Sequence, residues 1–169
     1  MTINTFLLPA TIVLCGLVAR LFYGYDCSVI KGLGKLTDKE YLVAFQHINR
    51  EIQNPYFFIS LMGAFVLQPL AAWTYCHETG YHSKWLLAAT FFYWTGAFGI
   101  TICVNVPLNN WLDSIHLENH SAESLNLIRQ KFETNWNKWH HLRTYAAILS
   151  FCCSVLFNTC CGRSAGMGM

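Results

Sequence analysis

Two asparagines stand where an apolar segment without charged residues comes to its end. Asn105 lies near the end of residues 85–108 and Asn109 directly follows them, so a helix would carry the two on one face. An amide in hydrocarbon costs a few kcal/mol unless it is hydrogen bonded, and other polar side chains must therefore meet this pair. The chain offers two groups of partners: Gln46, Asn49 and Asn54 in one segment, and Trp136, His140 and Arg143 in another.

His140 and Arg143 combine a group that can take a proton with a fixed positive charge. With Trp136 they follow spacings of four and three residues, which places all three on one helix face where an apolar segment begins. Structural alternatives stay open. Trp136 is typical of an interfacial anchor, Arg143 could extend its charge to the membrane surface, and the asparagines could join helices by hydrogen bonds worth about 0.6–2 kcal/mol each. The polar face of Gln46 and Asn49 could equally be solvated.

The elements that must position these residues are four apolar segments. The chain has 169 residues, of which 54% are hydrophobic and 12% are charged, against about 25% charged in an average soluble domain. The predicted spans are residues 6–25, 55–75, 85–108 and 143–161, each close to the roughly 20 residues that cross a bilayer as a helix. We therefore predict an all-α integral membrane protein, a four-transmembrane-helix bundle that forms a single domain over residues 1–169.

Two connections are expected to form helices that extend beyond the bilayer. Residues 39–54 carry apolar side chains at spacings of three and four, and Pro55 predicts a break at Asn54. Ser121 is a plausible N-cap for one uninterrupted helix that runs through the fourth span and is about 60 Å long. These helices should pack together as a cap formed by residues 26–54 and 109–142. Glycines 24, 32 and 34 suggest flexible backbone in the first connection.

Charge and composition bear on orientation and partners. An even number of spans puts both termini on one side, and most basic residues lie on the other, so the positive-inside rule predicts a cytoplasmic cap. The net charge is +2, and nothing points to nucleic acid. Membrane lipid surrounds such a bundle, and the glycine pair Gly96 and Gly99 could mediate a homo-oligomer.

Metal and cofactor signals are weak. His116 and His120 lie in a connection without a partner motif, and Cys76, His77 and His82 share a loop that fixes no coordination geometry. There is no phosphate loop and no nucleotide fingerprint. We predict no metal ligand and expect no cofactor, although a metal ion or a quinone stays open.

Three elements, in order, resemble the anthrone oxygenase-like integral membrane family. Residues 46–55 resemble its Q-x-x-N-x-x-I-x-N-P stretch, residues 105–109 its N-V-P-x-N element, and residues 136–144 its W-x-x-W-H-x-x-R-T element. The activity named for this family is the oxidation of an anthrone to an anthraquinone by O2 without a recognised cofactor. The positions that the resemblance carries over are Gln46, Asn49, Asn54, Asn105, Asn109, Trp136, His140 and Arg143.

The resemblance implies a lipophilic aromatic or quinone-like substrate. An anthrone that loses a ring C–H proton becomes an electron-rich enolate, which can pass an electron to O2. His140 is the expected base, and Arg143 with Asn105 or Asn109 the expected partner of the enolate oxygen. An aromatic slot could be lined by Phe132, Trp136 and Trp139.

Competing functions predict different interiors. An oxygenase predicts a cavity where the three elements converge. A non-enzymatic binder or structural subunit predicts that the same side chains are consumed in internal hydrogen bonds and leave no cavity. A channel is least supported, because the spans hold few polar residues.

Overall fold

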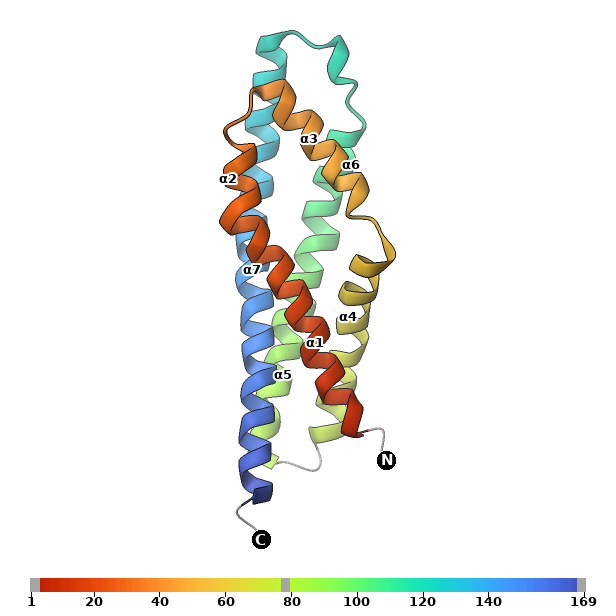
Figure 1. Cartoon of the computed structure of the whole chain (residues 1–169), viewed down its shortest axis with the longest axis vertical. Helices are drawn as coiled ribbons and strands as arrows, with labels where there is room; N and C mark the ends of the chain where they lie inside the picture. The colour runs from red at the N-terminus through yellow and green to blue at the C-terminus, as the bar shows by residue number, and fades with distance from the viewer. Residues whose placement is uncertain (1–3, 77–79, 167–169) are drawn as a thin grey trace.

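The computed structural model describes residues 4–76 and 80–166, and within these ranges the chain is helical and has no strand (Figure 1). The first helix, α1 (Asn4–Gly24), continues through the π-helical segment η1 (Tyr25–Val29) into α2 (Ile30–Leu33). The elements that follow are α3 (Asp38–Glu51), α4 (Pro55–Cys76), η2 (Gly80–Ser83), α5 (Lys84–Phe91), η3 (Phe92–Gly99), η4 (Thr101–Asn105), α6 (Val106–Asp113), η5 (Leu117–Asn119) and α7 (Ala122–Gly166).

Four helical stretches are long and apolar enough to cross a membrane: Phe6–Leu33, Pro55–Cys76, Lys84–Asp113 and Ala122–Cys160. This confirms the predicted all-α bundle with four membrane helices and indicates a multi-pass membrane protein. The first and third helices continue beyond the predicted ends at residues 25 and 108. Gly24 and Gly32 lie inside this helical stretch, and Gly24 has ordinary helical angles, φ −60° and ψ −37°. Flexibility of the first connection stays a prediction.

The predicted helix limits follow from local capping. Asn54 accepts a hydrogen bond from the Phe57 N–H through Oδ1 at 3.1 Å, so α3 and α4 are separate helices, as Pro55 predicted. Ser121 precedes α7, and its Oγ accepts a hydrogen bond from the Ser124 N–H at 3.3 Å. The single long helix is therefore confirmed: α7 has 45 residues, about 68 Å at 1.5 Å per residue.

The membrane part of the bundle has a close-packed core of small and aromatic side chains. Cys15, Val18 and Phe22 of α1 pack with Tyr93 of η3 and with Ala147 of α7. Gly96 permits the close approach of η3 to α7, because a Cβ there would lie 2.2 Å from the Cβ of Ala146. Gly96 therefore serves packing within the chain, and the suggested use of Gly96 and Gly99 for self-association stays a prediction.

A second core joins α3, α6 and the first half of α7. It contains Tyr41, Leu42, Phe45, Leu112, Leu117, Leu125, Phe132 and Trp136. In Figure 1 this assembly lies at the end of the molecule away from the start of α1 and the end of α7. The helices predicted to form a cap thus pack against one another, while their position outside a bilayer stays a prediction.

Candidate functional site

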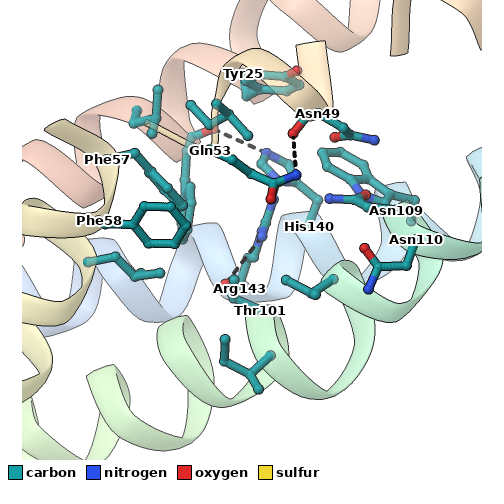
Figure 2. Close-up of a pocket in the computed structure, with 17 residues that line it drawn as sticks. Tyr25, Asn49, Gln53, Phe57, Phe58, Thr101, Asn109, Asn110, His140 and Arg143 are labelled. Atoms are coloured by element: carbon teal, nitrogen blue, oxygen red, sulfur yellow. Dashed lines mark hydrogen bonds between the residues drawn. The ribbon is translucent and has the colours of Figure 1, made fainter. Parts of the chain in front are cut away.

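A cavity of about 240 Å³ lies where the two cores meet, between α1, α3, α4, η4, α6 and α7 (Figure 2). Most of its wall is apolar, formed by Leu21, Phe22, Tyr25, Ile52, Phe57, Phe58, Leu61, Ile102, Val106 and Trp136. The polar side chains that reach it are Asn49, Gln53, Thr101, Asn109, Asn110, His140 and Arg143. An apolar cavity with a few convergent polar groups is typical of a small-molecule site.

Arg143 brings a positive charge to this apolar wall. Arg143 is 7% exposed, and its guanidinium packs 4.4 Å from the Phe22 ring and 5.2 Å from the Trp136 ring. Nη1 donates to Thr101 Oγ1 at 3.2 Å, and Figure 2 shows the side chain between Thr101 and the His140 ring. Among the described residues no carboxylate forms an ion pair with Arg143. A buried cation without a carboxylate in direct contact is costly, which favours an anionic ligand or transition state beside it.

The hydrogen bonds of His140 define its tautomer. Arg143 donates to His140 Nδ1 from Nε at 3.0 Å and from Nη2 at 2.8 Å, so Nδ1 carries the lone pair. Nε2 then carries the hydrogen and donates it to the Phe22 carbonyl at 3.2 Å. His140 is 1% exposed and stacks on Trp136 with a centroid distance of 4.6 Å. In this arrangement His140 holds Arg143 in place, and its lone pair is occupied.

The asparagine pair finds its partners on α7, in one of the two predicted segments. Asn109 Oδ1 accepts a hydrogen bond from Trp136 Nε1 at 2.7 Å, and Asn105 Nδ2 donates weakly to the Trp136 carbonyl at 3.4 Å. Asn105 Oδ1 is buried, and no residue that the structure describes forms a hydrogen bond with it. The amides therefore secure Trp136, and through its ring they support His140.

The structure brings half of the predicted site residues to the cavity. Those that line it are Asn49, Asn109, Trp136, His140 and Arg143. Asn49 lines the cavity, and its Nδ2 is buried without a hydrogen-bond partner among the described residues. Asn49 is 6% exposed.

The other predicted residues lie elsewhere. Gln46 Nε2 donates to the Leu112 and Ile115 carbonyls at 2.8 and 3.1 Å, which ties α3 to the end of α6. Asn54 caps α4, Phe132 is part of the second core, and Asn105 is fully buried behind the wall. Trp139 is absent from the cavity wall and packs with Lys138 instead. The predicted aromatic slot thus keeps Trp136 and draws its other rings from α1 and α4.

Sequence reasoning missed several residues that surround His140 and Arg143. Tyr25 packs 5.6 Å from the His140 ring, and the Asp26 carboxylate lies near both His140 and His141. Thr101 is the acceptor for Arg143. All three come from the π-helical segments η1 and η4, a local geometry that is frequent at functional sites and that no residue pattern here announced.

The described residues contain no cluster of three or more His, Cys, Asp or Glu side chains that could hold a metal ion. His116 and His120 are exposed and do not line the cavity. His77, which belonged to the considered loop cluster, lies outside the residues that the structure describes.

Comparison with known proteins gives a family match. The family model described as anthrone oxygenase matches residues 56–153, more than half of the chain. The matched range includes the elements at residues 105–109 and 136–144 and begins just after the element at residues 46–55. No curated protein and no solved structure matches the chain.

Proposed function

The chain belongs to the anthrone oxygenase family, and on that premise we propose that the cavity beside Arg143 binds a lipophilic aromatic ketone of the anthrone type and promotes its oxidation by O2. The observation that carries the proposal is the buried guanidinium of Arg143, which has no carboxylate partner among the described residues and faces an apolar cavity. Such a charge suits an anion that forms only during reaction.

Arg143 has donors to spare for that anion. A guanidinium carries five N–H groups, and three of them are used here, on His140 Nδ1 and Thr101 Oγ1. The second N–H of Nη1 and that of Nη2 have no protein acceptor among the described residues. We propose that these two N–H groups donate hydrogen bonds to the ketone oxygen, and that the bonds become stronger as the ketone oxygen becomes an enolate oxygen.

Proton removal requires a second rearrangement. After the two spare N–H groups bind the ketone oxygen, the guanidinium shifts toward it, so that its Nε and Nη2 hydrogen bonds to His140 Nδ1 break and the lone pair there can take a proton from the ring methylene. The new charges compensate one another, since the enolate lies against Arg143 while the imidazolium lies near Asp26, whose Oδ1 is 3.4 Å from His140 Nε2. His140 thus has two successive roles, as the support of Arg143 and as the base.

The oxidation then needs only O2. The enolate gives one electron to O2, and the resulting ring radical and superoxide combine at the former methylene carbon to form a peroxide. Cleavage of the O–O bond with loss of the second C–H proton yields the quinone carbonyl and releases water. One anthrone and one O2 therefore give one anthraquinone and one water, with the ring as the reductant and O2 as the oxidant.

The cavity supports a small, flat, hydrophobic ligand. Its volume of about 240 Å³ lies below the roughly 300–1,000 Å³ of sites for drug-sized ligands. The free Nδ2 donor of Asn49 suits a further oxygen on the ligand, such as a ring hydroxyl or the second carbonyl of the product. The apolar wall limits water, which strengthens the electrostatic effect of Arg143.

The test is turnover of a hydroxylated anthrone by protein purified in mild detergent, followed by quinone absorbance and O2 uptake. We expect Arg143→Gln to lower the rate about 100-fold or more, the usual loss of an oxyanion donor, while Arg143→Lys retains part of it. Arg50→Gln is the matched control, because Arg50 is exposed and, in the part of the chain that the structure describes, its ion pair is with Asp113 at the surface. Full turnover by Arg143→Gln, or wild-type turnover no faster than in buffer with detergent, would overturn the proposal.

A second candidate function is a non-enzymatic binder of the same class of molecule. It is favoured by the hydrogen bonds that occupy both ring nitrogens of His140. The existence of the cavity speaks against a purely structural role. Stoichiometric binding of an anthraquinone, measured by quenching of tryptophan fluorescence, without any turnover of the anthrone would select the binder.

Orientation and assembly are also proposals. We propose that α1 begins and α7 ends on the non-cytoplasmic side, with the helices α3 and α6 toward the cytoplasm, on the strength of the basic residues of that end. Both ends lie together in Figure 1, which fits four membrane crossings. Self-association stays a prediction, to be checked by the mass of the detergent-solubilised particle.

A further inference from the structure

A carboxylate in the first membrane helix lies between two histidines of α7. Asp26 Oδ1 is 2.9 Å from His141 Nδ1 and 3.4 Å from His140 Nε2. Both contacts are short, yet neither is aligned as a hydrogen bond, and Oδ1 is buried without such a partner in residues 4–76 and 80–166. Side-chain exposure rises along the row, from 1% for His140 through 17% for Asp26 to 50% for His141. The row thus leads from the cavity wall to the surface.

We propose that Asp26 and His141 form a proton relay that connects His140 to the surface of the protein. The inference rests on the proposed function, because it supplies the route for the proton that His140 removes from the substrate. Neither residue touches the cavity, so both act through His140, as positioning and relay residues.

The relay can be written bond by bond. A substrate C–H bond breaks and an N–H bond forms at His140 Nδ1. The hydrogen on His140 Nε2 then moves to Asp26 Oδ1, and from there to His141 Nδ1. Phe22 O accepts a hydrogen bond from Nε2 but cannot keep the proton, because a peptide carbonyl is a very weak base; the carboxylate beside it can. The reverse sequence returns a proton for the water that leaves when the peroxide is cleaved.

The relay would remove the repulsion between a protonated His140 and Arg143. The charged and titratable groups that face His140 are Arg143 and the adjacent His141 from α7, and Tyr25 and Asp26 from η1. A protonated His140 next to Arg143 would set two positive charges against each other. Passing the Nε2 proton outward leaves His140 neutral in its other tautomer, so that only the enolate and Arg143 remain as a charge pair in the cavity.

The experiment is deuterium exchange at the methylene of an anthrone in D2O without O2, which records proton removal and leaves the ring unoxidised. We expect Asp26→Asn to lower the protein-catalysed exchange rate about tenfold or more, within the range of general acid–base effects. His141→Gln should lower it as well, and added imidazole should restore exchange to that variant, which a merely structural loss would not allow. Asp26→Glu should retain part of the rate.

Controls separate the possible failures. His116→Gln changes an exposed histidine away from the site and should exchange like wild type. Anthraquinone binding is measured for every variant. Exchange at the wild-type rate in Asp26→Asn and His141→Gln overturns the relay alone. Parallel loss of exchange and of quinone binding, without rescue by imidazole, also overturns it, since it indicates a structural role. Wild-type exchange no faster than in buffer refutes the proposed function together with the relay.

Discussion

Trp136 links the amides of one helix to the charged pair of another. Its Nε1 donates to Asn109 at 2.7 Å, and its ring stacks on His140 with an interplanar angle of 11°. The Arg143 guanidinium lies 5.2 Å from the same ring. The stacked Trp136 indole restricts the His140 ring to one orientation, and this orientation directs Nδ1 toward Arg143.

Replacing Trp136 by phenylalanine should separate this hydrogen bond from the stacking. We expect Trp136→Phe to lower the free energy of unfolding by about 1–3 kcal/mol, because Asn109 Oδ1 loses its donor in a partly buried place. Thermal unfolding in detergent measures the effect. Trp139→Phe is the control, with an expected change near 0.5 kcal/mol, since Trp139 packs outside the site. Equal destabilisation by the two changes would contradict the role given to the bond.

At the scale of elements, the position of the site depends on how closely the membrane helices approach. Gly96 of η3 faces Ala146 of α7, three residues beyond Arg143 in the chain. This contact holds η3 and the following η4 against α7. Thr101 of η4 can therefore reach the guanidinium at 3.2 Å.

A methyl group at Gly96 should push these helices apart. We expect Gly96→Ala to destabilise the protein by about 1–3 kcal/mol, the usual cost of overpacking, because the new Cβ would lie 2.2 Å from the Ala146 Cβ. Gly24→Ala is the matched control, since nothing lies within 4 Å of a Cβ there and the backbone is helical. That control should stabilise by about 0.4–1 kcal/mol. Thermal unfolding in detergent compares the two, and a neutral Gly96→Ala would refute the close contact.

At the scale of the whole molecule, one side chain of α7 fastens the turn between α2 and α3. Arg129 donates to the Gly34 and Leu36 carbonyls at 3.1 and 2.9 Å and pairs with Asp38 at 3.0 Å and Glu133 at 2.8 Å. Hydrogen bonding by Asn126 and by Arg129 lowers the pKa of Asp38 below its usual value. The first membrane helix and the second core are thereby held in one arrangement around the cavity.

Arg129→Lys should loosen this arrangement although it preserves the charge. A lysine cannot reproduce the fork of donors, so we expect a loss of about 1–3 kcal/mol and faster amide hydrogen exchange in α3. The Asp38 contribution should be complete above the usual aspartate pKa of 3.8 and fade as the pH falls through the lowered value, because the depressed pKa favours the folded carboxylate. Lys131→Arg, at an exposed basic position of α7, is the control. Unchanged exchange in α3 of Arg129→Lys would exclude the fastening role.

Local features of the sequence determined the membrane helices and their limits. Apolar length marks the four spans, Asn54 with Pro55 separates α3 from α4, and Ser121 starts α7, because each signal acts within a few residues of chain. The spacing of Trp136, His140 and Arg143 likewise places them on one helix face before any tertiary contact exists. The family match covers residues 56–153, which include this helix face.

Only the tertiary structure decided which side chains meet. Gln46 forms a hydrogen bond to the Leu112 carbonyl, and Phe132 packs in the second core. Asn109 accepts a hydrogen bond from Trp136, and Tyr25 and Asp26 of the first membrane helix lie beside His140. The physical reason is rotational: a π-helical turn such as η1 or η4 changes the direction of every following side chain, and the partner of a helix face is a segment distant in the chain. Neither the turn nor the partner is contained in the spacing of residues along one segment.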